Sequence, residues 1–409
     1  MMNYKFNMKL DYNLKLKNRS KVKVIFVMVL LLCSMLMLLN IPELVSADNS
    51  NDVTQELSIN IDNIINAIDF KDIENIANEL DALDLFKTSV KDKVKDILNG
   101  NYFIDYTSLS GAILSLIFGD IKSFVPILFT IVAIGILCSL LDNFKSSNSV
   151  SDTIYFVGFA VVVIIILIAF KDILFGLNTI INSITGQMQI IFPILMAMLT
   201  SIGSVASISI YNPLLSIFTS IVSIVFEKVL YPIFVIIFLM TVIGNLTITV
   251  KLDKFSNFLN STFKWIIGFV FTIFTGFLSI QGISAGKFDS ISIKTTKFAM
   301  KSYIPIIGSY ISEGMDFLIL GSVLVKNTIG LVGVLLVFVT IISPIINIVV
   351  FKLGLQLTSA ILELSGADRL SGFLSSCAKV LVLPIVILLG IAFMYVITIS
   401  LIMCTANIF

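Results

Sequence analysis

The chain has 409 residues, of which 57% are hydrophobic and 13% charged, and its formal net charge is +1. Soluble domains are roughly a quarter charged, so this composition excludes an ordinary soluble protein and predicts a polytopic membrane protein. The chain has no histidine, which excludes Ser-His-Asp and Cys-His catalytic systems and histidine-ligated metal sites. The sequence has no basic patch with interleaved aromatic residues, so it does not indicate nucleic-acid binding. We expect no enzymatic activity, no cofactor and no metal.

The first 47 residues have the three parts of a secretory signal peptide. Residues 1–23 carry seven Lys and Arg against one Asp, an apolar run follows at 24–39, and Val45-Ser46-Ala47 offers a small-residue cleavage site. The apolar run is shorter than the about 20 residues that a spanning helix needs. We therefore predict a cleavable signal peptide at 1–47, with an uncleaved first transmembrane helix as the alternative.

The next segment, 48–123, is acidic, with six lysines against 14 acidic residues. Short cytoplasmic loops gather Lys and Arg instead, so we expect this segment outside the cytoplasm. Its apolar residues recur at helical spacing, and Gly100 is a plausible helix stop. The apolar positions are 61, 64, 65 and 68, then 73, 76, 77 and 80, then 90, 94, 97 and 98. We predict a small helical unit, which either forms a bundle on the membrane surface or docks a partner.

Residues 124–409 are predicted to form a multispanning membrane domain, which makes the whole chain an all-α, polytopic helical protein. Apolar runs of spanning length predict about seven or eight spans. Seven clear candidates lie at 124–141, 154–170, 188–210, 229–250, 263–283, 328–350 and 380–404. Two further apolar stretches, 213–226 and 303–322, are interpreted as spanning, re-entrant or interfacial.

The region 284–326 places charged residues and glycines between apolar segments, where polar groups usually have a function. Lys294, Lys297 and Lys301 share one helix face, so 287–301 is interpreted as an amphipathic helix with lysines toward lipid phosphates. A plain cytoplasmic loop helix fits the same pattern.

Two acids and one lysine follow on the next segment. Glu313 and Asp316 are three residues apart and therefore neighbours on a helix. Lys326 lies ten residues beyond Asp316, close enough to pair with it if the backbone turns. These groups are interpreted either as a pore lining or as a buried ion pair that holds helices together.

Three phrases in this region resemble the stage III sporulation protein AE family. They are KTTKF at 294–298, IPIIG at 304–308 and VKNTIGLVG at 325–333, and Gln281-Gly282 just upstream fits too. The leader, the acidic exported segment and the multispanning remainder agree with this family.

The resemblance implies a membrane subunit of an envelope complex that joins mother cell and forespore and supports late forespore development. It implies residence in the mother-cell-derived membrane, with sister subunits and a forespore-membrane protein as partners, and with residues 48–123 between the two membranes. The alternative function is a stand-alone secondary transporter.

From this region we select two sets of candidate residues. The polar residues expected to contact lipid or partners, or to pair within the membrane, are Lys294, Lys297, Lys301, Glu313, Asp316, Lys326 and Asn327. The residues expected to serve as hinges or close-packing positions are Gly282, Pro305, Gly308, Gly330 and Gly333.

Overall fold

The computed structural model describes residues 51–80, 89–100, 106–143, 148–246, 252–303 and 308–405. The predicted signal peptide at 1–47 lies outside these residues. Within the described ranges the chain forms α-helices and one π-helix, and no strand, which confirms the predicted all-α fold class.

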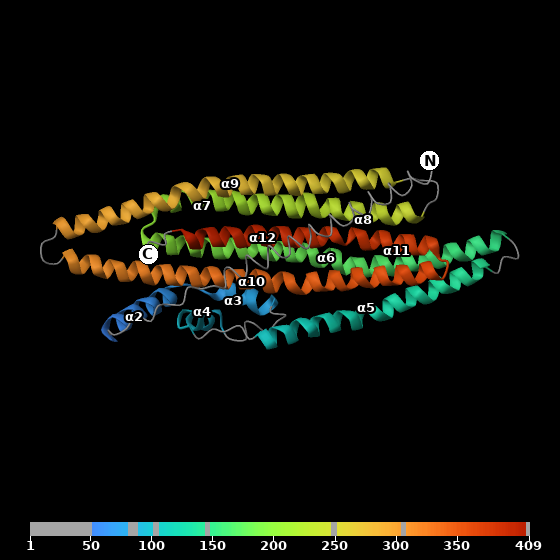
Figure 1. Ribbon diagram of the computed structural model, residues 1–409, viewed down its shortest axis with the longest axis horizontal. Helices are drawn as coiled ribbons and strands as arrows, with labels where there is room; N and C mark the ends of the chain where they lie inside the picture. Colours follow the sequence, from blue (N-terminus) through green and yellow to red (C-terminus); the bar gives the residue numbers. More distant parts are fainter. Residues whose placement is uncertain are drawn as a thin grey trace, which may run out of the picture. The chain divides into compact units, whose positions relative to one another are not determined.

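The helices are long, as the uninterrupted apolar runs require (Figure 1). In chain order they are α2 (Asn51–Ala67), α3 (Lys71–Leu80), α4 (Val90–Leu98), α5 (Tyr106–Asn143), α6 (Asn148–Ile202), α7 (Val205–Val222), the π-helix η1 (Ser223–Leu230), α8 (Tyr231–Leu246), α9 (Asp253–Tyr303), α10 (Gly308–Leu364), α11 (Asp368–Val380) and α12 (Val382–Cys404).

The helices α2, α3 and α4 are short and amphipathic. The predicted stripes are buried at Ile65, Ile73 and Val94. Ser89 begins α4 by accepting a hydrogen bond from the Asp92 amide at 3.1 Å, a typical N-cap. After α4, Gly100 has a φ of 70°, the left-handed conformation that glycine adopts without strain, so this predicted helix stop is confirmed.

The three short helices pack on the long ones. Contacts join α2 and α4 to α10, and α3 to α6. At Gly321 of α10, side chains of Ile61 and Ile64 come within 3.6 Å of the position that a Cβ would occupy. The apolar stripes of this segment are therefore buried against the helix bundle.

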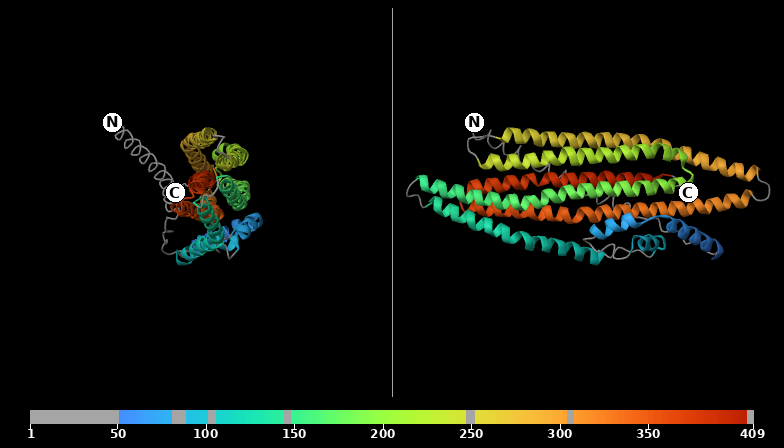
Figure 2. Two further views of the ribbon diagram at one scale, coloured as in Figure 1. Left: turned by 90° about the vertical axis from the view of Figure 1, so that its right-hand side faces the viewer. Right: turned by 180° about the vertical axis from the view of Figure 1, so that it is seen from behind.

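In the long-helix bundle, α12 lies at the centre, surrounded by α6, α10, α8 and α9 (Figure 2). The pair α7 and α8 runs beside α9 on one flank of α12, and α5 runs beside α10 on the other (Figure 1). Two polar contacts also tie the layers together. Gln187 of α6 donates to Thr340 of α10 at 2.7 Å, and Asn347 of α10 donates to Asp120 of α5 at 3.0 Å.

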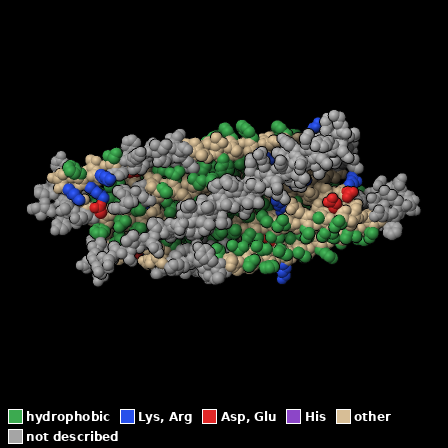
Figure 3. All heavy atoms as spheres, in the orientation of Figure 1, with side chains coloured by type: hydrophobic (Ala, Val, Ile, Leu, Met, Phe, Trp, Pro, Cys, Tyr) green, Lys and Arg blue, Asp and Glu red, His purple; other side chains and the backbone are tan. Residues whose placement is uncertain are grey.

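Six helical stretches in the described residues are long and apolar enough to cross a membrane, which indicates a multi-pass membrane protein. They are Leu109–Leu140, Phe156–Ile202, Val205–Leu246, Lys254–Gly276, Gly314–Leu364 and Asp368–Cys404. Large hydrophobic side chains are exposed along them (Figure 3), as expected where lipid or protein covers a surface.

The structure groups the apolar runs differently from the sequence pattern. The run at 154–170 and most of the run at 188–210 lie in one helix, α6. The ambiguous stretch 213–226 continues through η1 into α8, so it is not separated from the run at 229–250. Within the stretch 284–326, residues 284–303 form the end of α9 and residues 308–326 form the beginning of α10. The predicted number of seven or eight spans stays a prediction.

Candidate functional site

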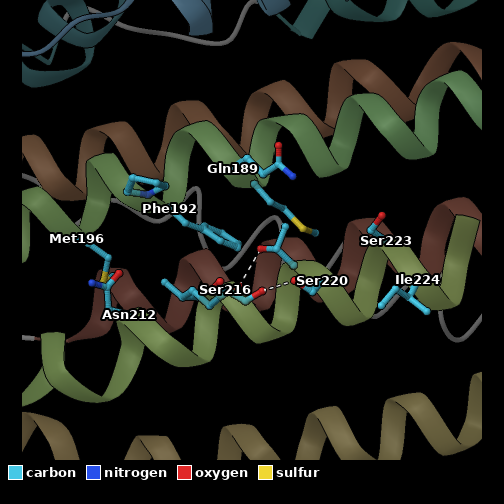
Figure 4. Close-up of a pocket in the computed structure, with 12 residues that line it drawn as sticks. Gln189, Phe192, Met196, Asn212, Ser216, Ser220, Ser223 and Ile224 are labelled. Atoms are coloured by element: carbon cyan, nitrogen blue, oxygen red, sulfur yellow. Dashed lines mark hydrogen bonds between the residues drawn. The ribbon is translucent and has the colours of Figure 1, made fainter.

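An open groove of about 480 Å³ lies between α6 and α7 and continues onto η1 (Figure 4). The α6 side contributes Gln189, Phe192 and Met196, and the α7 side contributes Asn212, Ser216 and Ser220 (Figure 4). Polar groups are concentrated on the α7 side, although α7 belongs to a 42-residue apolar span. The groove therefore has one polar side within a membrane-type bundle, while its other lining residues are mostly apolar.

The polar residues of α7 and η1 form one continuous stripe, which we call the α7 stripe. Its members are Ser209, Asn212, Ser216, Ser220, Ser223 and Glu227. Successive members are three or four residues apart, so they share one helix face. From Ser209 to Ser220 the stripe follows α7, and from Ser223 to Glu227 it continues on the π-helix η1.

Two serines of the stripe donate their hydroxyl hydrogens to carbonyls of their own helix. Ser220 donates to the Ser216 carbonyl at 2.9 Å, and Ser209 donates to the Val205 carbonyl at 2.9 Å. This back-bonding satisfies the donor and leaves the hydroxyl oxygen available as an acceptor. The stripe consequently presents acceptor oxygens of serine beside the Asn212 amide, which can both donate and accept.

A charged pair stands at the far end of the stripe, inside η1. Ser223 donates to Glu227 at 3.2 Å, and Lys228 forms an ion pair with Glu227. The Glu227 side chain is 16% exposed and that of Lys228 is 67% exposed. π-Helical segments occur frequently at functional sites, and charged residues within membrane spans are rare unless they serve a function.

A second polar cluster lies where α10 passes the end of α12. Lys326 is fully buried and donates to the backbone carbonyl of Thr405. The Thr405 hydroxyl is 3.0 Å from the hydroxyl of Tyr211 on α7. One lysine and one tyrosine thus tie the end of α12 to two other helices.

One turn before Tyr211, the beginning of α7 is capped from another helix. Asp289 of α9 is fully buried and accepts hydrogen bonds from the amides of Ala206 at 3.0 Å and Ser207 at 3.2 Å. Ser204 occupies the N-cap position but makes no side-chain cap bond. A carboxylate at a helix N-terminus satisfies orphan amides and complements the helix dipole, so Asp289 fixes where α7 begins.

The predicted lysines divide between two environments. Lys297 forms an ion pair with Asp316 across the α9–α10 hairpin, while Lys294 and Lys301 are exposed. The predicted pairing of Asp316 with Lys326 is wrong. Because α10 continues through both residues without a turn, they are separated by about 15 Å of helical rise.

The remaining candidates lie in or near α10. The Oδ1 atom of Asn327 is buried without a hydrogen-bond partner. A Cβ on Gly330 would lie 2.5 Å from Met403 Sδ, and one on Gly333 would lie 2.9 Å from Ile399 Cδ1. Glycine at these two positions lets α10 approach α12 closely. Pro305 lies outside the described residues. Gly282 lies in α9, and Gly308 and Glu313 lie in α10, so the roles expected of these four residues stay predictions.

Sequence reasoning missed the α7 stripe, Asp289, Tyr211 and Thr405. The stripe had a detectable signal, because its serines recur every three or four residues within an apolar run. Asp289 and Thr405 had none, since each acts on a helix distant in sequence. Among the described residues no group of three or more Cys, Asp or Glu is arranged to hold a metal ion.

The comparisons with known proteins agree on one family. No solved structure matches the chain. The protein named stage III sporulation protein AE of Bacillus subtilis (strain 168) is 24% identical over 326 residues, covering 79% of this chain and 82% of that protein. The family described as stage III sporulation protein AE matches residues 88–406. This match extends over most of the chain, which therefore belongs to the stage III sporulation protein AE family.

Proposed function

We propose that this chain is an integral membrane subunit of a channel complex that links mother cell and forespore and is required for late forespore development. The proposal assigns it to the mother-cell-derived membrane around the forespore. Its partners are other subunits of the same stage III complex and a protein of the forespore membrane. Residues 48–123, which include α2, α3 and α4, lie on the extracytoplasmic side and face the space between the membranes.

The α7 stripe is the observation that supports this function best. Asn212 and Glu227 of the stripe are unfavourable against hydrocarbon, where unsatisfied polar groups cost several kcal/mol. The back-bonded serines between them cost less. Polar surface in a membrane bundle instead lines a water-filled cavity or meets another protein. A subunit that contributes a polar path has this property, and a purely structural anchor does not need it.

The proposed mechanism is positioning rather than catalysis. The α7 stripe provides a row of acceptor oxygens that replaces part of the hydration of a passing solute. The closely packed contact of α10 with α12 at Gly330 keeps the neighbouring helices in register. The exported helices provide the surface that partners outside the membrane contact.

The test changes the chemistry of the stripe in a sporulating host whose own copy of the gene is deleted. We expect the double substitution Ser216→Leu and Ser220→Leu to abolish heat-resistant spores at normal protein level in the membrane. Ser261→Leu is the matched control. Ser261 is also an exposed serine on an apolar helix and donates to the carbonyl four residues earlier, at 2.9 Å, but it lies on α9 away from the groove.

Normal spore yield from the double variant would contradict the proposal that the stripe carries the function. Loss of spores in the Ser261→Leu control as well would mean that the defect comes from a general disturbance of the bundle.

A further inference from the structure

A second groove, of about 310 Å³, runs between α7 and α9, which lie side by side (Figure 1). All the side chains that line it are apolar. Two of them, Ile217 and Phe269, are half exposed, while Phe218 and Phe274 are buried and stack with their ring centroids 5.2 Å apart. The groove therefore has a closed aromatic floor and an open apolar edge, which suits hydrocarbon better than a polar ligand.

The helices on both sides of this groove lack charged residues over matching segments. The charge-free segment is 205–226 on α7 and η1, and 265–286 on α9. The α9 segment has 22 residues, which at 1.5 Å per residue is about 33 Å, and the hydrocarbon core of a bilayer is about 30 Å thick. Both segments stop at the same level, because Asp289 of α9 accepts from the Ala206 amide at the beginning of α7.

At their other end, both segments are followed by a lysine. The helix α9 runs antiparallel to α7 and η1. Lys228 lies ten residues after Phe218, and Lys264 lies ten residues before Phe274, its stacking partner. Because the rise per residue is similar along both helices, the two lysines are nearly level. Both are exposed, and Lys264 forms no salt bridge with another residue that the structure describes.

The single tryptophan of the chain lies at this level too. Trp265 is 68% exposed and stacks on Phe269 of the groove with ring centroids 5.2 Å apart. Tryptophan and lysine are the residues that gather where hydrocarbon meets water. On the side away from the groove only nine residues separate Lys264 from Lys254, too few to cross a bilayer. Hydrocarbon therefore fits on the groove side of Trp265.

We propose that the surface formed by 205–228 and 264–286, the α7–α9 flank, binds an anionic phospholipid. An acyl chain occupies the groove, and Lys228, Lys264 and Trp265 contact the headgroup region. Of the charges in these two segments, only Glu227 is acidic, so the headgroup end has a net positive charge that complements a phosphate. A covering protein helix would require neither the bilayer-matched length nor tryptophan at its end. The inference does not depend on the proposed function, since the groove lies on a different face of α7 from the stripe.

The first experiment measures the depth of the flank in a bilayer. Because the chain has a single tryptophan, its fluorescence reports position 265 alone. The full chain is reconstituted in vesicles of phospholipids that carry bromine, a quencher, either near the headgroup or near the end of the acyl chains. We expect bromine near the headgroup to quench Trp265 more strongly.

The matched control moves the tryptophan along the same flank. The variant with Trp265→Phe and Ile273→Trp places it eight residues further into the charge-free segment, about 12 Å away. Ile273 is 51% exposed and lines the groove. We expect bromine near the chain end to quench this variant more strongly.

The second experiment tests the headgroup. Brominated phosphatidylglycerol in unbrominated phosphatidylcholine, and the reverse mixture, give the relative affinity of the flank for the two lipids. We expect a preference for phosphatidylglycerol, which Lys264→Gln lowers by about fivefold, the effect of one lysine near an anionic surface. Lys301→Gln is the control, because Lys301 is also exposed on α9 but lies 36 residues from Trp265, and we expect it to leave the preference unchanged.

If bromine at neither depth quenches Trp265, or if the two tryptophan positions give the same depth, something other than lipid covers the flank and the proposal is refuted. Depth as expected, with no preference for phosphatidylglycerol or with equal effects of Lys264→Gln and Lys301→Gln, rejects an anionic headgroup as the ligand of this end. Spore yield is not part of either measurement, so neither failure bears on the proposed function.

Discussion

The contact between α10 and α12 predicts different effects for two glycine substitutions on the same helix. Gly330→Ala places a Cβ 2.5 Å from Met403 Sδ and 2.6 Å from Met403 Cγ, with Ile399 Cγ2 at 3.2 Å. Gly314→Ala places a Cβ where no atom lies within 4 Å. Both changes gain about 1 kcal/mol of intrinsic helix propensity, so this gain cancels when the two variants are compared.

The remaining difference is the cost of overpacking. Inserting a methyl group into a packed contact typically costs about 1–3 kcal/mol. We expect the free energy of unfolding of Gly330→Ala to lie below that of Gly314→Ala by about this amount. Relative to the unmodified chain, Gly314→Ala should be stabilised and Gly330→Ala unchanged or destabilised. Unfolding in detergent, followed by circular dichroism with increasing denaturant, measures both values.

A rescue variant tests the cause. Met403→Ala removes the side chain that the new methyl group would meet, so Gly330→Ala should be less harmful in that background than in the unmodified chain. Equal stability of Gly330→Ala and Gly314→Ala, or no rescue, would refute the close contact between α10 and α12 at this position.

Two further substitutions address the polar contacts. Asp289→Ala should destabilise the chain by about 1–2 kcal/mol, as loss of a helix cap does, while Ser204→Ala should have a smaller effect. Thermal unfolding in detergent compares the two variants. Equal effects would reject the capping of α7 by Asp289. Exchanging Lys297 and Asp316 should restore the stability that the single substitution Lys297→Asp removes. Because the two side chains are 17% and 40% exposed, a double-mutant cycle should give a coupling energy of about 1 kcal/mol or less. A coupling energy of zero would mean that the ion pair does not contribute to stability.

Local sequence pattern predicted the helices of the N-terminal segment well. The spacing of Ile65, Ile73 and Val94 matches the faces that are buried, and Gly100 follows the end of α4. An amphipathic stripe and a glycine act within a few residues, so the information needed to place such helices is local.

The division of the apolar runs and the polar contacts were harder to predict. Lys171 and Asp172 interrupt the apolar pattern of α6, although both lie within one continuous helix, because two exposed charges do not break helical hydrogen bonding. In the same way, the charged residues Glu227 and Lys228 separate the apolar runs 213–226 and 229–250 in the sequence, although the helix continues through them. For Lys326, the sequence suggested an acid nearby in the chain, whereas its partner is a backbone carbonyl 79 residues away.

What the sequence determined by itself is the class of the protein: an all-helical chain of apolar segments, with an acidic amphipathic unit before them. Composition and periodicity are sufficient for that, since burial of apolar surface depends on residue type and spacing alone. Only the tertiary structure decided which polar groups meet. Three contacts depend on how helices distant in sequence pack together. They are the placement of the α7 stripe beside α6, the cap that Asp289 provides, and the hydrogen bond from Lys326 to Thr405.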